Sequence, residues 1–160
     1  MKKKGFTLVE LLAVIAILAI LVIVAMPNVL GMFNQAKYNT FVTEVQSYMD
    51  AAKTAFVSSA LTNPAETLQF SSYDNNHDDL SMSGNKKYYV KMDRFGNYVR
   101  VVVWDTNFCY DSGTKASTDA FKKEDVKADA IMTGLASGVT EPTSGEPAAT
   151  FCNSTKAVDQ

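Results

Sequence analysis

The chain has 160 residues, 47% of them hydrophobic, and a formal net charge of −2. That length accommodates one modest domain with its own core and is too short for two. A net charge so close to zero gives no electrostatic footprint for nucleic acid or anionic lipid. The apolar residues are crowded into positions 1–26, and the remainder of the chain is polar.

The N-terminus combines a basic start with an apolar run of membrane length. Lysines occupy positions 2–4, Gly5 follows, and residues 6–26 are polar only at Thr7 and Glu10. As a helix this run would be about 30 Å long, which is enough to cross a bilayer. The lysines would keep its N-terminal end in the cytoplasm under the positive-inside rule. We therefore expect a membrane-inserted helix.

Two simpler interpretations of this segment compete with that expectation. A secretory signal peptide would need a cleavage site of two small residues, and positions 24–27 offer only Ala25. A plain single-pass anchor fits the length and is the stronger alternative. It leaves Glu10 unexplained, because a carboxylate in the apolar part of a membrane helix costs several kcal/mol.

The presence of Glu10 in the apolar helix is explained if the chain is cut between Gly5 and Phe6. The cut creates an α-amino group at the start of the helix, where a positive charge opposes the helix macrodipole. Glu10, four residues on, neutralises that charge within one chain or in a neighbouring chain. A buried charge pair with a defined partner also sets the register between subunits. On this reasoning Glu10 makes sense only beside a free N-terminus, and especially in a polymer.

The leader and the residues after it carry a family resemblance. Gly5-Phe6-Thr7-Leu8-Val9-Glu10-Leu11-Leu12 resembles the class III signal and N-terminal helix of type IV pilins and pseudopilins, over roughly residues 2–35. The resemblance implies that a prepilin peptidase cuts after Gly5 and methylates the new terminus at Phe6. It assigns the assembly acid of the family to Glu10 and its helix-perturbing proline to Pro27.

Beyond Pro27 the helical pattern resumes. The proline removes a backbone donor inside the helix, so we expect a kink or local melting of the turns before it. Asn63-Pro64 ends the helix. Polar residues at positions such as Asn39 and Asp50 form one face of this second half. The other face is apolar at helical spacing and comprises Phe41, Val45, Tyr48, Met49, Ala52, Ala55 and Phe56.

The rest of the chain predicts a small antiparallel sheet. Residues 65–87 are polar and rich in turn formers, and strand patterns follow them. The predicted elements are strands over 88–92, 98–104 and 108–110, a turn over 93–97, and a short helix over 119–126 capped by Thr118. Two or three strands alone are marginal in water, so the sheet needs the long helix. The expected class is α+β, with a long N-terminal helix on an antiparallel sheet as in pilins.

Two cysteines, Cys109 and Cys152, lie in the polar part of the chain. They are too few for a zinc site without histidines, and the single histidine is His77. If the N-terminal segment sends the body outside the cytoplasm, a disulfide is expected. Its loop of about 40 residues would contribute about 4 kcal/mol in the chain-entropy model. Two free buried thiols remain the alternative.

No catalytic constellation, cofactor motif or metal motif stands out. Asp74, Asp78 and Asp79 with His77 offer oxygen ligands for calcium, but their spacing fits no EF-hand. We therefore expect a solvated loop and no bound metal.

A second candidate is a set of cations around the predicted strands that could contact DNA. Acids elsewhere offset this set, so an ordinary surface is favoured and no nucleic-acid partner is expected. The cations are Lys86, Lys87, Lys91, Arg94 and Arg100.

The resemblance implies a domain plan and a function. The plan is a cleaved leader (1–5), a membrane and filament-core helix (6–27), its amphipathic half (28–62) and a globular C-terminal region (63–160). The implied function is that of a structural, non-enzymatic subunit of a type IV pilus, serving adhesion, twitching motility, aggregation or DNA uptake.

The subunit would sit in the cytoplasmic membrane, in contact with lipid, with its N-terminus cytoplasmic. Assembly machinery would then extract it into an extracellular filament of identical subunits. Two alternatives remain: a pseudopilin of a type II secretion or competence system, and a membrane-anchored extracytoplasmic binding domain that never polymerises.

Overall fold

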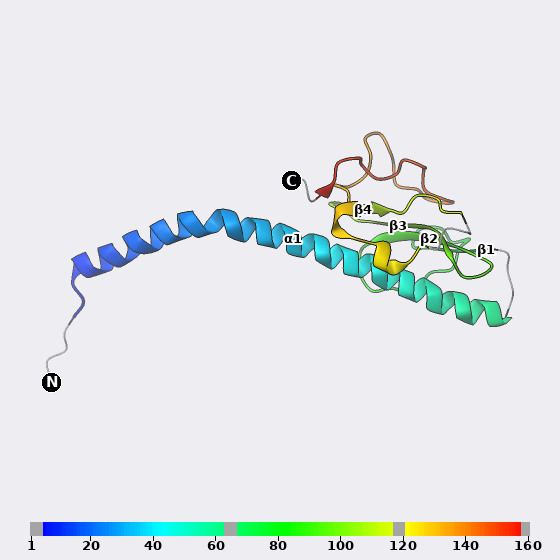
Figure 1. Cartoon of the computed structure of the whole chain (residues 1–160), viewed down its shortest axis with the longest axis horizontal. Coiled ribbons are helices and arrows are strands. Elements are labelled where there is room, and N and C mark those ends of the chain that lie inside the picture. Colours follow the sequence, from blue (N-terminus) through cyan, green and yellow to red (C-terminus); the bar gives the residue numbers. More distant parts are fainter. Residues whose placement is uncertain (1–4, 63–66, 117–120, 158–160) are drawn as a thin grey trace. The chain divides into compact units, whose positions relative to one another are not determined.

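The computed structural model describes residues 5–62, 67–116 and 121–157. The chain divides into two compact units, Met1–Lys37 and Tyr38–Gln160, and the second is called the head below. In chain order the elements are α1 (Leu8–Thr62), β1 (Thr67–Ser71), β2 (Lys87–Asp93), β3 (Tyr98–Trp104), β4 (Cys109–Asp111) and the 3-10 turns η1 (Lys123–Asp125) and η2 (Ala128–Ala130) (Figure 1). The expected α+β class is confirmed.

In the first unit, α1 keeps its apolar side chains outside any core. Every described side chain from Gly5 to Lys37 is exposed, and this part of the helix is long and apolar enough to cross a membrane. The helix runs without interruption through Pro27, so the expected local melting is absent here. One proline removes a single N–H donor, and the bonds of the neighbouring turns keep the backbone helical.

In the head, the second half of α1 packs on one face of the sheet. The strands lie in the order β1-β2-β3-β4 and all pair antiparallel. Phe41, Val45 and Met49 are buried in one cluster with Val90 of β2 and Val101 of β3. The predicted apolar face of the helix is therefore confirmed as the face that covers the sheet.

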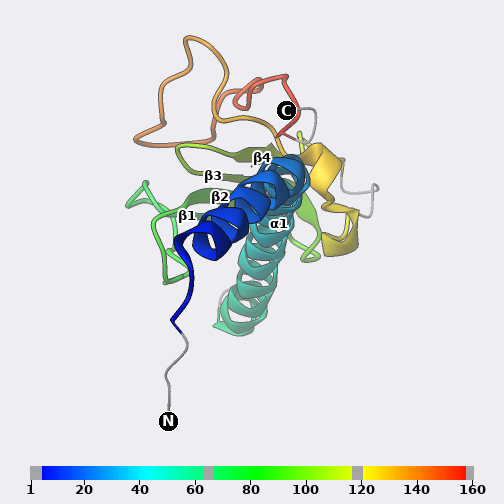
Figure 2. The ribbon, with the colours of Figure 1, turned by 90° about the vertical axis from the view of Figure 1, so that its left-hand side faces the viewer.

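The other face of the sheet is covered as well. Tyr89, Val102 and Trp104 form a second core with Phe151, which belongs to the C-terminal segment (residues 135–157). Figure 2 shows this segment on the opposite side of the sheet from the head part of α1. The central strands β2 and β3 are thus buried on both faces, which explains their nearly continuous apolar runs.

The strand predictions for β2 and β3 are confirmed. The strand predicted over 108–110 is β4, which begins one residue later than expected. The assignment of all of 65–87 to turns is wrong, because β1 pairs with β2 in the register Phe70 to Val90. Only Leu68 and Phe70 are large and apolar in this edge strand, so its partner rather than its own pattern defines it. The helix expected over 119–126 is also wrong: only the turn η1 forms there, and Thr118 lies outside the described residues.

The turn between β2 and β3 is held rigidly against α1. The Asp93 carboxylate accepts the backbone N–H groups of Phe95 at 2.9 Å and Asn97 at 2.8 Å. Gly96 has φ +80°, and a Cβ there would lie 2.8 Å from Cε1 of Phe56. Lys53 on α1 donates to the Gly96 carbonyl at 2.6 Å. Only glycine fits this position without displacing an aromatic ring.

Gly96→Ala should therefore destabilise the head more than the same change at Gly113. Both glycines have positive φ, but a Cβ at Gly113 meets nothing within 4 Å. The left-handed conformation costs about 1–2 kcal/mol in either variant, and crowding against Phe56 adds about 1–3 kcal/mol at position 96. Urea unfolding of the full chain in detergent, followed by fluorescence of the single tryptophan Trp104, measures both losses. Equal losses would contradict the close packing of the turn on Phe56.

Candidate functional site

The start of α1 is closed by a reciprocal pair of hydrogen bonds. The Thr7 carbonyl accepts the first helical N–H, from Leu11, which makes Thr7 the N-cap residue. The Thr7 backbone N–H donates to Oε2 of Glu10 at 2.8 Å, and the Thr7 hydroxyl donates to the same oxygen at 2.7 Å. The Glu10 N–H donates in return to Oγ1 of Thr7 at 3.3 Å. This is a capping box.

Glu10 therefore caps its own helix, a role beyond the neutralisation of a free N-terminus. The spacing Thr7-x-x-Glu10 is the known signature of a capping box, so the sequence already contained the signal. The two bonds that Thr7 donates both end on one carboxylate oxygen. A carboxylate has about four lone-pair sites, so the group can still accept an amine from another chain.

The Gly5–Phe6 junction lies before the helix. Both residues are exposed, and neither belongs to α1. The Phe6 side chain is 87% exposed. The junction is therefore accessible and outside regular secondary structure. The lysines at positions 2–4 lie outside the described residues.

The loop that suggested calcium is tied to the C-terminal segment. Asp74 is buried, and its carboxylate accepts the N–H of Gly145 at 2.6 Å and that of Asn76 at 2.9 Å. The bond from Gly145, followed by that from Asn76, lowers the pKa of Asp74. Nδ1 of His77 lies 3.3 Å from the same carboxylate. The expectation of a solvated loop is therefore wrong for Asp74, which joins two loops.

The other carboxylates of that loop face different partners. Asp79 accepts the N–H of Ser81 at 3.0 Å and the hydroxyl of Tyr88, while the Asp78 side chain is exposed. Among the described residues, no group of three or more His, Cys, Asp or Glu side chains is arranged to hold a metal ion. Asp74 and Asp79 therefore connect this loop to the C-terminal segment and to β2 by hydrogen bonds.

Most of the cations around the strands are already paired with acids. Lys86 lies 2.9 Å from Glu44, and Lys91 lies 3.0 Å from Glu146. Lys87 pairs with Glu141. These contacts pair most of the cations proposed for DNA contact with carboxylates and favour the ordinary-surface interpretation.

Arg100 is not on the surface at all. It is 3% exposed and donates to Asp111 at 2.7 Å, and its guanidinium also reaches the carbonyls of Pro147 and Ala148 at 2.7 and 2.6 Å. Burial alone would lower the pKa of Arg100, but Asp111 raises it, so the group is charged. Strand parity places Arg100 on the face of β3 that carries Trp104, and the C-terminal segment that covers this face buries it.

The disulfide between Cys109 and Cys152 forms, as the sequence predicts, across 43 residues. It joins β4 to the C-terminal segment, close to where Arg100 binds the same segment through Glu146 at 3.2 Å. Burial alone would raise the pKa of Glu146, but hydrogen bonds from Lys91 and Arg100 lower it. One covalent bond and several charged hydrogen bonds therefore hold this segment on the sheet.

These depressed pKa values predict acid sensitivity of the head. Asp74 and Glu146 titrate lower in the folded chain than their unfolded values of about 4. Their contribution to the free energy of unfolding is fully present above about pH 4, and it is lost as the pH falls through their pKa values in the folded chain. Asp74→Asn should therefore reduce the fall of the melting temperature below about pH 4.

The measurement is a series of thermal melts between neutral pH and about pH 2, followed by Trp104 fluorescence. Asp78→Asn is the matched control in the same loop, because its side chain is exposed, and it should keep the original pH dependence. An unchanged dependence in Asp74→Asn would assign the acid sensitivity to other carboxylates.

Comparison with known families identifies a motif in the N-terminal segment. Residues 1–26 match the family model described as the prokaryotic N-terminal methylation motif. No curated protein and no solved structure matches the chain. The motif is the class III signal peptide characteristic of type IV pilins and pseudopilins, a structural class of proteins. The chain therefore carries the N-terminal methylation motif of a protein of the type IV pilin and pseudopilin type.

Proposed function

We propose that this chain is the structural subunit of a type IV pilus and that its work is to polymerise. The observation that carries the proposal is the exposed first half of α1, which begins within a methylation motif over residues 1–26 and bears a single acid. Residues 1–5 are the leader, 6–27 the membrane and filament-core segment, 28–62 the amphipathic half of the helix, and 63–160 the remainder of the globular part.

The apolar surface of α1 supports polymerisation because it has no partner within its own unit. Large apolar side chains from Phe6 to Phe33 are exposed, and water is an unfavourable environment for such a surface. Lipid covers it before assembly, and the helices of neighbouring subunits cover it afterwards. Exchanging lipid for protein contact gives far less free energy than transfer from water, so shape and charge direct assembly.

Processing supplies the charge that assembly needs. Prepilin peptidase cuts between Gly5 and Phe6 and methylates the new Phe6 terminus, one residue before the N-cap Thr7. The cationic amine of one subunit then pairs with Glu10 of a neighbour, where the capping box already holds the carboxylate in place. Such a pair sets the register between helices in the filament.

The subunit begins in the cytoplasmic membrane with its N-terminus on the cytoplasmic side. The assembly machinery that the motif implies then moves it into an extracellular filament. Mass spectrometry of the mature chain tests the processing: a methylated Phe6 terminus is expected, and a retained leader contradicts it. Electron microscopy then tests polymerisation, since surface filaments made mainly of this chain distinguish a pilin from a secretion pseudopilin or an anchored binding domain.

Two variants separate the charge of Glu10 from its capping role. Glu10→Gln keeps an oxygen that accepts the Thr7 N–H but loses the negative charge, whereas Thr7→Ala loses the cap and keeps the charge. Glu10→Gln should reduce filament yield about tenfold or more, because removing one partner of a buried pair costs about 3 kcal/mol or more. Thr7→Ala should cost only about 1 kcal/mol at the helix start and still give filaments.

The yield of sheared filaments is compared with the amount of chain in the membrane fraction. Both variants should leave that membrane amount unchanged. Filaments of normal yield from Glu10→Gln would refute the charge pair. Loss of filaments from Thr7→Ala alone would show that assembly needs the cap instead.

A further inference from the structure

The turn between β2 and β3 presents a rigid aromatic side chain to solvent. Phe95 is 67% exposed, and the Arg94 guanidinium stacks 4.7 Å from the centre of its ring. The bonds to Asp93 and the close packing of Gly96 fix the backbone beneath this pair. A rigid, exposed pair of Arg and Phe loses little conformational entropy on binding, and both types are frequent in interface centres.

A cleft of matching chemistry lies elsewhere on the head, between α1 and the loop that precedes β2. Its volume is about 270 Å³, which is slightly smaller than the roughly 300–1,000 Å³ of sites for drug-sized ligands. Tyr48 and Met82 supply its apolar wall, and Glu44 supplies a carboxylate whose side chain is 39% exposed. Ser47 and Lys86 complete the rim.

The turn and the cleft are complementary in both apolar chemistry and charge. An aromatic ring packs favourably beside a methionine sulfur and a tyrosine ring, which Met82 and Tyr48 offer. Arg94 has the opposite charge to Glu44, which already pairs with Lys86 of the same cleft at 2.9 Å and keeps lone-pair sites for a second cation. An entering Phe95 would place its stacked guanidinium at the edge of the cleft, where that carboxylate lies.

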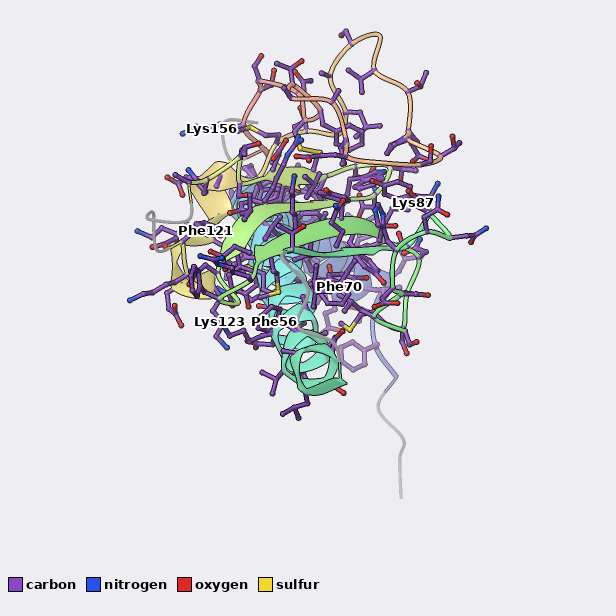
Figure 3. All side chains as sticks on the ribbon, turned by 90° about the vertical axis from the view of Figure 1, so that its right-hand side faces the viewer. Phe56, Phe70, Lys87, Phe121, Lys123 and Lys156 are labelled. Atoms are coloured by element: carbon purple, nitrogen blue, oxygen red, sulfur yellow. A yellow bond between two sulfur atoms is a disulfide. The ribbon has the colours of Figure 1, made fainter. Side chains whose placement is uncertain are left out.

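One copy of the head cannot fill its own cleft, because the two features lie on opposite flanks of α1. The turn contacts the helix at Lys53 and Phe56, whereas Glu44 and Ser47 line the cleft. At 3.6 residues per turn, the two pairs lie about 180° apart around the helix. Figure 3 shows the flank of the turn, where Phe56 of α1 lies on the same side of the head as Phe121 and Lys123.

We propose that the Arg94–Phe95 turn of one copy inserts into the Glu44–Tyr48–Met82 cleft of a second copy. This inference rests on the proposed polymerisation and names the contact between heads. A contact between two different patches repeats head-to-tail and gives an open helical array when the rotation does not close. The contact points differ by about nine residues of α1, so parallel copies that share the contact are offset by roughly 14 Å along the helix.

A pair of cysteines tests the contact in assembled filaments. Ser47→Cys and Arg94→Cys are combined in one chain, which keeps the Phe95 ring and whose native cysteines are already joined in the Cys109–Cys152 disulfide. Mild oxidation should then produce a ladder of covalent dimers, trimers and higher multimers on a non-reducing gel. Each single variant should give no ladder beyond dimers, since one cysteine per chain cannot link three copies.

The matched control combines Ser47→Cys with Leu61→Cys. Leu61 is 84% exposed near the end of α1 and lies outside the proposed contact, so this pair should give no ladder. Phe95→Ser should likewise reduce filament yield about tenfold or more, as expected for loss of a hot-spot side chain, whereas Leu61→Ser should leave the yield unchanged.

The outcomes separate this inference from the proposed function. Filaments that form but give no ladder, or a ladder equally strong in the control pair, overturn the docking contact alone. Absence of filaments from the unsubstituted chain contradicts polymerisation, and the docking contact fails with it. Normal filament yield from Phe95→Ser also overturns the contact, because an exposed side chain can be changed without unfolding the head.

Discussion

The whole structure depends on how one helix of 55 residues buries its apolar surface. From Tyr38 onward an apolar face covers one face of the sheet, and the core on that face exists only because the helix is present. In the first half every described side chain is exposed, so the partner must come from outside that unit. A single helix thus provides one side of a core of the head and, in the proposed function, the surface that joins subunits. The capping box of Thr7 and Glu10 gives this helix a defined start.

The second face of the sheet is covered by a segment without regular helices or strands among its described residues. The C-terminal segment has few apolar residues, and Phe151 with its neighbours covers Trp104 and Tyr89. Charged hydrogen bonds supply the remaining order: buried Arg100 binds Asp111 and two carbonyls, and Asp74 holds the N–H of Gly145. Because both charges are satisfied by several partners, burial is tolerated. The disulfide then restricts the same segment in the unfolded chain.

The sequence predicted the elements whose pattern is local and strong. The apolar run of the N-terminus, the helical spacing of Phe41 and Val45, and the strands on either side of Gly96 are all as expected. The failures share a cause. The edge strand β1 and buried Arg100 have weak local signals and are defined by partners on other strands and loops. Thr7 is different, because its spacing from Glu10 carried a capping signal that could have been recognised.

By itself the sequence determined the N-terminal device: a methylation motif over residues 1–26, a membrane-length helix and a carboxylate at its head. These features are contiguous, so chain order alone brings their chemistry together. Tertiary structure decided which charges are buried and what the head presents to a neighbour. Arg94 and Arg100 are six residues apart and equally basic in sequence, yet the first is stacked on the exposed Phe95 and the second is buried. Arg94 lies in the turn between β2 and β3, whereas Arg100 lies in β3 on the face that the C-terminal segment covers, so contacts between distant parts of the chain decide which of the two is buried.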